Sequence, residues 1–158
     1  EAARDPDSGQ PEQEKVFHIA DHVFLGTKHG AADRRLLDSL GITAVVNLTA
    51  GKTRVPNHFE GSGIQYVHLE LLDELISDPT YAIPRGVEAV RWWGQEGTSV
   101  LVHCQAGLSR SATLVVAWLL RDRNYSLKDA AELMTKQRGR RPRCNPSFWC
   151  FLSGLERE

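Results

Sequence analysis

The stretch SVLVHCQAGLSRSATLVVAWLL, from Ser99 to Leu120, decides the fold. Residues 99–102 predict a buried strand, and the largely apolar run 112–120 predicts a buried helix. Between them lies a short loop that begins at Cys104, and five residues separate this thiol from Arg110. A strand, a loop and a helix N-terminus in this order can bind an anion, because backbone N–H groups and the positive end of the helix face the same point. The spacing therefore predicts a phosphate site that contains a nucleophile.

The side chains of this loop suit a phosphate group, which carries nearly two negative charges at neutral pH. Arg110 presents a planar pair of N–H donors to two phosphate oxygens, which a lysine cannot do. Gly107 allows a backbone conformation that a side chain would hinder. We expect the phosphate to be bound by Arg110 and by the loop residues Gln105, Ala106, Gly107, Leu108 and Ser109.

Cys104 is the predicted nucleophile. A free thiol has a pKa of about 8.5, and positively charged surroundings lower it to roughly 3.5–7.5. A drop of about 3 units corresponds to about 4 kcal/mol of preference for the thiolate. We expect Ser111 to donate a hydrogen bond to this thiolate and His103 to orient the loop through its imidazole. A lone cysteine after an apolar strand is usually a small buried hydrophobe, but the full string around Cys104 favours catalysis.

The string HCQAGLSRSAT, residues 103–113, resembles the signature of the cysteine-dependent dual-specificity protein phosphatases, and it is most similar to catalytic domains of the MAP-kinase-phosphatase type. The resemblance extends over residues 16–156 and includes the segments HVFLG (22–26), LGITAVVNLT (40–49), PNHFEG (56–61) and NPSF (145–148). Two positions depart from the family pattern: Cys144 stands where a proline is frequent, and Trp118 where a tyrosine is usual. Both indicate changes of packing and leave the expected mechanism intact.

This resemblance implies an activity. It is the hydrolysis of phosphotyrosine and phosphoserine or phosphothreonine in proteins, through a cysteinyl-phosphate intermediate and without a metal or other cofactor. The implied partners are phosphorylated proteins, with MAP kinases among the candidates. We expect a monomer that binds neither nucleic acid nor a membrane.

The resemblance also implies a proton donor for the leaving group. In the family this acid is an aspartate on an earlier loop, at the position that Asp73 occupies here. The pattern agrees, because residues 64–69 alternate like a half-buried strand and ligands bind beyond the strand ends of open α/β sheets. Glu70, Glu74 and Asp78 compete for the role, and a solvated acidic loop is the alternative interpretation.

Strands that alternate with helices predict a single α/β domain, with a central twisted, mostly parallel sheet of about five strands flanked by helices, as in the dual-specificity type of the protein tyrosine phosphatase fold. Residues 1–15 are polar and aperiodic and are predicted to be a flexible tail, and 16–158 form the catalytic domain. The resemblance places the first strand at 22–26. The residue pattern predicts strands at 42–48 and 64–69, and helices at 33–40 closed by Gly41, at 83–93, from Ser126 to a stop at Gly139, and from Pro146 onward.

Composition limits the classes of protein to which this chain can belong. The chain has 158 residues, 41% of them hydrophobic and 25% charged, which fits one globular domain. Its net charge of −1 gives no general attraction to nucleic acid, and it shows neither a membrane-length apolar run nor a signal peptide. Three cysteines, an odd number, favour a reduced intracellular setting, cytoplasmic or nuclear or both. The six histidines show no metal-ligand spacing, so no metal is expected.

Two other groups admit two interpretations each. Cys144 and Cys150 are expected to be ordinary residues of the last helix region, and the alternative makes one of them a redox partner of Cys104. The basic run 136–143 is either a solvated loop or an anion-binding rim beside the site, in which Arg138 would contact a second phosphate or an acidic substrate residue.

Two alternative functions are compatible with the sequence. The same chemistry can act on a phosphoinositide, a phospholipid or a phosphoglucan. The loop lacks the lysines that suit inositol lipids, and it carries Ser109 where glucan-type relatives tend to have glycine. A non-catalytic phosphoprotein-binding domain is the third hypothesis, against which the presence of Cys104, Arg110 and a candidate acid counts.

Overall fold

The centre of the computed structural model, which describes residues 15–74, 77–106 and 109–157, is a five-stranded sheet in the order β1-β2-β5-β3-β4. The strands are β1 (Val16–Ala20), β2 (Val23–Gly26), β3 (Ile42–Asn47), β4 (Gln65–His68) and β5 (Ser99–His103). Neighbouring strands are parallel except for the antiparallel pair β1 and β2. The predicted mostly parallel sheet is therefore confirmed. The edge strand β1 was not predicted, because the turn at Asp21-His22 carries none of the usual hairpin signals.

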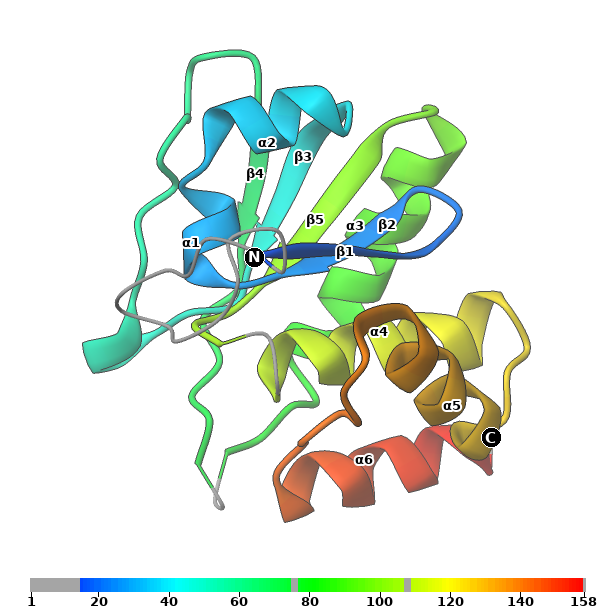
Figure 1. Cartoon of the computed structure of the whole chain (residues 1–158). Helices are drawn as coiled ribbons and strands as arrows, with labels where there is room; N and C mark the ends of the chain where they lie inside the picture. Colours follow the sequence, from blue (N-terminus) through cyan, green and yellow to red (C-terminus); the bar gives the residue numbers. More distant parts are fainter. Residues whose placement is uncertain (1–14, 75–76, 107–108, 158) are drawn as a thin grey trace.

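Helices cover both faces of the sheet (Figure 1). Helices α1 (Lys28–Ala31) and α2 (Arg34–Ser39) pack on one face. The other face carries α3 (Ala82–Gln95), α4 (Arg110–Asp122), α5 (Leu127–Arg138) and α6 (Pro146–Glu156). All the predicted helices are present. Helix α1 and the 3-10 turn η2 (Gly51–Thr53) were not predicted, because they are too short to show a helical period. The prediction of a flexible tail concerns residues that, up to residue 14, lie outside the described part of the chain.

Local signals set the helix ends. The side chain of Ser126 accepts a hydrogen bond from the backbone N–H of Asp129, and Gly139 ends α5 with a φ of 75°. Gly41 closes α2 in the same way, with a φ of 71°. At the last helix, Asn145 is the N-cap and Pro146 occupies the first turn. These starts and stops agree with the sequence predictions.

The central strands are buried on both faces, as the apolar runs predicted. In β5, Val100 and Val102 belong to the larger core under α3–α6, whereas Leu101 belongs to the smaller core under α1 and α2. Trp93 of α3 is 3% exposed and belongs to the core, whereas Trp92 is 54% exposed at its rim. The strands β3, β4 and β5 run parallel and end at one edge, where the loops that follow them meet.

Helix α4 is the most deeply buried helix of this arrangement. Its residues from Arg110 to Leu119 are all buried, since α3, α5 and α6 pack around it and the sheet covers another side. The close approach of α3 and α4 requires a glycine at position 86. A Cβ atom on Gly86 would lie 2.1 Å from Leu114 Cδ1, and Leu114 is itself fully buried.

We predict that Gly86→Ala lowers the free energy of unfolding by about 1–3 kcal/mol, because the new methyl group overpacks the α3–α4 contact. The matched control is Gly154→Ala in α6, where a Cβ atom would meet nothing within 4 Å. That change should raise stability by up to about 1 kcal/mol, as expected for alanine in an open helical position. Urea unfolding of both variants measures the difference, and equal effects would contradict the packing argument.

Candidate active site

Cys104 lies where β5 ends, with its thiol directed to the first turn of α4. Its Sγ is 3.2 Å from the Oγ of Ser111, and the cysteine is 3% exposed. The structure thus brings together the two residues that the sequence placed on either side of the loop. A hydroxyl at this distance can donate to a thiolate, which is the contact expected for a sulfur that must leave again.

The loop between them is anchored at both of its described ends. The carbonyl of Gln105 accepts a hydrogen bond from Lys28 N–H at 2.9 Å, and the carbonyl of Ser109 accepts one from Thr113 Oγ1 at 2.7 Å. Gln105 and Ala106 are exposed. The predicted phosphate contacts of Gly107 and Leu108 lie outside the described residues. The N-cap Ser109 makes no side-chain bond to the first turn of α4, so that turn keeps its N–H groups for other acceptors.

The Arg110 guanidinium is held by two other loops. Its Nη1 donates to Thr53 Oγ1 and to the carbonyl of Leu71, both at 3.1 Å. The residue is 4% exposed, and its Nε–H has no hydrogen-bond partner among the described residues. A buried, fixed guanidinium with neutral partners and an unpaired N–H is suited to an anion. Thr53 and the Leu71 carbonyl are contacts that sequence reasoning missed.

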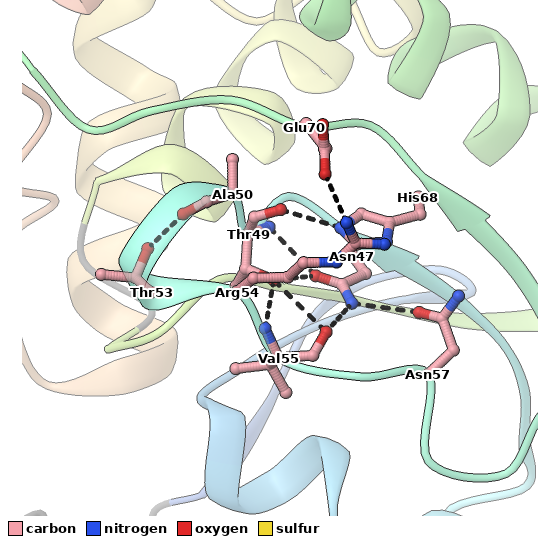
Figure 2. A network of polar contacts seen from close by, with 9 residues as sticks. All are labelled: Asn47, Thr49, Ala50, Thr53, Arg54, Val55, Asn57, His68 and Glu70. Carbon is pink, nitrogen blue, oxygen red and sulfur yellow. Dashed lines mark hydrogen bonds and ion pairs between the residues drawn. The ribbon is translucent and has the colours of Figure 1, made fainter.

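A buried polar network fixes the loop that carries Thr53 (Figure 2). The Asn47 side chain donates to the Val55 carbonyl at 2.7 Å and to Asn57 Oδ1 at 3.0 Å. Its Oδ1 accepts from the backbone N–H and the hydroxyl of Thr49, at 3.0 and 2.6 Å. Both ends of the amide are thus paired, which makes the network rigid as well as costly to disturb. The signal in the sequence was a polar residue, Asn47, at the end of a buried apolar strand, with Thr49 close behind it.

Of the four candidate acids, Asp73 is the one whose position fits best. Glu70 forms a 2.9 Å ion pair with Arg54 (Figure 2). The carboxylate of Asp78 accepts bonds from the hydroxyl and the N–H of Thr80, and the hydroxyl bond above all lowers the pKa of Asp78, which disfavours a proton donor. Glu74 and Asp73 both line a cavity beside Arg110, but of these two only Asp73 is bonded to a described residue of the cysteine loop.

Asp73 is exposed, and its Oδ1 accepts two hydrogen bonds. One comes from Ser109 Oγ at 2.8 Å and the other from Asn145 Nδ2 at 2.9 Å. Asp73 and Arg110 line one cavity of about 530 Å³, together with Lys52, Thr53, Glu74 and Gln105. The cavity therefore combines an anion-binding cation with a carboxyl group that can exchange a proton with solvent.

The cavity beside Arg110 is not the largest hollow on the described part of the molecule. A larger hollow of about 940 Å³ lies between α5 and α6, and its walls include Leu127, Ala131 and Trp149. No described residue of the Cys104–Ser111 loop lines it. Among the described residues, no group of three or more histidine, cysteine or acidic side chains could hold a metal ion, and no helix is both long and apolar enough to cross a membrane.

Arg138 occupies a different place from the exposed rim that the sequence suggested. It is 7% exposed, and its guanidinium carbon lies 5.7 Å from the centre of the Phe17 ring. Burial lowers the pKa of its guanidinium, and its Nε and Nη1 have no hydrogen-bond partner among the described residues. Arg140 and Arg143 of the same run are exposed. The run is thus divided between one buried arginine and solvated neighbours.

The described cysteines are free thiols. Cys150 is exposed on α6. Cys144 is buried, its Sγ lies 3.9 Å from the carbonyl of Ser109, and burial raises the pKa of its thiol to about 11. Cys144 is therefore a neutral thiol that packs against the end of the cysteine loop, where it can replace the proline that is frequent in the family.

His103 is a buried neutral residue. It is 1% exposed, and its Nδ1–H donates to the carbonyl of Cys104 at 3.0 Å. Burial, with smaller contributions from nearby positive groups, lowers the pKa of His103 from 6.5 to about 4. The imidazole thus supports the backbone at the cysteine without adding a charge beside it.

Comparisons with known proteins show the family of this chain. A family model described as "Dual specificity phosphatase, catalytic domain" matches residues 23–158, and the chain belongs to that family. Human Dual specificity protein phosphatase 2 is 36% identical over 121 residues, which cover 77% of this chain and 37% of that protein. This chain spans about a third of the length of the first curated relatives it matches.

Solved structures share the fold over nearly the whole chain. Human DUSP28 superimposes with a TM-score of 0.81 at 26% identity, and the match covers 89% of this chain and 95% of that one. PTPMT1 in complex with PI(5)P superimposes with a TM-score of 0.74, also at 26% identity, and covers 89% and 94% of the two chains. The fold predicted from the resemblance is confirmed.

The buried His103 predicts an acid-sensitive stability. Because its folded pKa of about 4 lies below the unfolded value of 6.5, the unfolded chain binds a proton that the folded protein excludes. The stability is fully present above pH 6.5 and is lost as the pH falls toward 4. At pH 5 the expected loss from this residue is about 2 kcal/mol.

His103→Asn, which keeps an N–H donor but cannot titrate, should remove this loss. Urea unfolding at pH 7 and pH 5 should therefore show a smaller difference between the two pH values for the variant than for the parent protein, by about 2 kcal/mol. The exposed His18, changed to Asn, is the control. Identical pH dependence of His103→Asn and the parent would contradict the buried neutral imidazole.

Proposed function

We propose that this protein hydrolyses phosphotyrosine and phosphoserine or phosphothreonine in proteins. The observation that supports the proposal is the meeting of three groups at one edge of the sheet. They are the Cys104 thiol bonded to Ser111, the buried Arg110 with an unpaired N–H, and the Asp73 carboxyl on the same cavity. Together they supply a nucleophile, an anion-binding group and a proton donor.

In the first step, the sulfur of Cys104 attacks phosphorus while Arg110 and the loop N–H groups hold the phosphoryl oxygens. The P–O bond to the substrate breaks, and its electron pair stays on the leaving oxygen, which takes the proton of Asp73. In the second step, Asp73 removes a proton from water, and the water oxygen attacks phosphorus. The S–P bond breaks, phosphate leaves, and the Ser111 hydroxyl stabilises the returning thiolate.

The proposed function includes a class of substrate, an oligomeric state and a cellular location. Phosphorylated proteins, MAP kinases among them, are the proposed partners, and the protein is proposed to act as a monomer in the cytoplasm, the nucleus or both. A lipid phosphate is the second candidate, because PTPMT1, which shares the fold, was crystallised with PI(5)P. The cavity has one described lysine, Lys52, which does not by itself favour a highly charged inositol lipid.

Asp73→Asn tests the acid. The variant should lose about 10²-fold or more in kcat on a phosphothreonine peptide, because an alkoxide is a poor leaving group without a proton. An aryl phosphate with a good leaving group should lose much less. The ratio of the two activities is the measurement, and an equal loss on both substrates would contradict the acid role of Asp73.

Controls separate this reaction from its alternatives. Cys104→Ser should abolish turnover of the aryl phosphate in the presence of a chelator, whereas the parent protein should retain it. A panel of phosphopeptides and phosphoinositide vesicles then compares kcat/KM for the two substrate classes. Higher values on the vesicles would favour the lipid candidate, and no turnover on either would favour a binding domain.

Arg138 is proposed to attract a second acidic group of the substrate through its charge, because its buried Nε and Nη1 have no hydrogen-bond partner among the described residues. Arg138→Met, which keeps a long apolar side chain at the buried position, combined with Arg140→Ala should raise KM for doubly phosphorylated peptides about tenfold, the effect of about 1.4 kcal/mol. KM for a small aryl phosphate should not change. Removing the exposed charges of Arg35 and Lys128 is the control, and an unchanged KM on the peptides would leave only a structural role for Arg138.

A further inference from the structure

The N-terminus of α6 is bonded to the loop that carries the proposed acid, although the two segments lie far apart in the sequence. Asn145 Nδ2 donates to Asp73 Oδ1 at 2.9 Å and to the carbonyl of Glu74 at 3.2 Å. The hydroxyl of Ser147 also lies 3.3 Å from the carbonyl of Ser77, farther along the same loop. The loop after β4 runs beside the start of α6 (Figure 1).

The orientation of the Asn145 amide is determined by its surroundings. Its Oδ1 accepts from the backbone N–H of Phe148 at 3.1 Å and from the hydroxyl of Ser147 at 2.7 Å. The oxygen end thus faces two donors and the nitrogen end faces two acceptors, so a flipped amide would lose these contacts. One side chain therefore caps the helix with its oxygen and binds the acid loop with its nitrogen.

Ser109 provides the second tether. A serine at a helix N-cap ordinarily accepts a bond from the first turn of its own helix, but Ser109 makes no such bond and donates to Asp73 Oδ1 instead. It is the residue directly before Arg110 and is 6% exposed. The acid is thus bonded to the cysteine loop on one side and to α6 on the other.

We propose that Asn145, together with Ser109, is a positioning residue that determines which oxygen of Asp73 carries the transferable proton. Both donors point to Oδ1, so the lone pairs of this oxygen are occupied and the proton resides on Oδ2. The two bonds also limit rotation of the carboxyl group, which directs one oxygen to the leaving group in every turnover. This inference rests on the proposed acid role of Asp73.

Asparagine suits this role better than the other common cap residues. Serine or threonine would cap α6 but lacks a second polar end that reaches the acid loop. Aspartate would cap the helix equally well, but it would place a second carboxylate against Asp73. The other charged groups on this cavity are Lys52, Glu74 and Arg110, and the neutral thiol of Cys144 is nearby. A substitution at Asn145 leaves each of these groups in the protein.

Two variants separate positioning from capping. Asn145→Ser keeps a helix cap and removes the donor to Asp73. Asn145→Asp keeps the cap and adds a like charge, which disfavours ionisation of the pair. Both should lower kcat on a phosphothreonine peptide about tenfold, a part of the 10²–10⁴ that a general acid contributes, and should leave the aryl phosphate within about twofold.

The pH profile is the readout that a structural role would not change. The alkaline limb of kcat/KM reports the acid, so Asn145→Ser, which removes a donor to the carboxylate without adding a charge, should move that limb to higher pH. Ser126→Ala, which removes the N-cap bond of α5, is the control for a lost cap away from the acid loop. It should leave both the limb and the ratio of the two substrates unchanged.

Asp73→Asn shows whether a negative result contradicts the acid role of Asp73 or only the positioning role of Asn145. If Asp73→Asn affects both substrates equally, the acid assignment fails, and the positioning role fails with it. If Asp73→Asn acts selectively but the Asn145 variants lower both substrates equally with an unmoved limb, only the positioning role fails. The double variant Asp73→Asn/Asn145→Ser should be no slower than Asp73→Asn alone, because Asn145 acts through Asp73.

Discussion

The burial of α4 on nearly all sides is the constraint on which the site depends. A helix surrounded by α3, α5, α6 and the sheet cannot rotate or slide without opening the core, so its N-terminus keeps one position relative to the end of β5. Cys104 and Ser111 lie on the two sides of that junction. Their contact is therefore a consequence of core packing, and the short loop between them has only to close a gap whose ends are already fixed.

The same core holds a charge that it does not neutralise. The described partners of Arg110 are the hydroxyl of Thr53 and the carbonyl of Leu71, which are both neutral. A buried cation without a counter-ion is costly, and the cost falls when a phosphate dianion is bound. The network around Asn47 supports this arrangement, because it prevents the Thr53 loop from relaxing toward the arginine's unpaired N–H. Arg110 thus provides the attraction for a phosphate, and the network around Asn47 provides the rigidity of the Thr53 loop.

Hydrogen bonds, and not burial, place the proposed acid. Asp73 is exposed on a loop with no regular structure, and it owes its position to side chains from the cysteine loop and from α6. The last helix is therefore part of the proposed catalytic arrangement, although it contributes no reacting atom. The proposed nucleophile is held by burial and the proposed acid by hydrogen bonds, which leaves the carboxyl group access to the solvent protons that the proposed turnover needs.

The amino-acid sequence alone determined the strand–loop–helix unit around Cys104, the parallel sheet and the helix ends at Ser126, Gly139 and Pro146, and through the family resemblance it proposed Asp73 as the acid. Those features follow from periodicity, capping residues and a contiguous motif, which are local. Only the tertiary structure decided that Thr53 binds Arg110, that Asn145 binds Asp73 and that Arg138 is buried. The bonded pairs are 57 and 72 residues apart, and no local pattern encodes a contact between segments that meet only when parallel strands end at one edge and the core closes over α4.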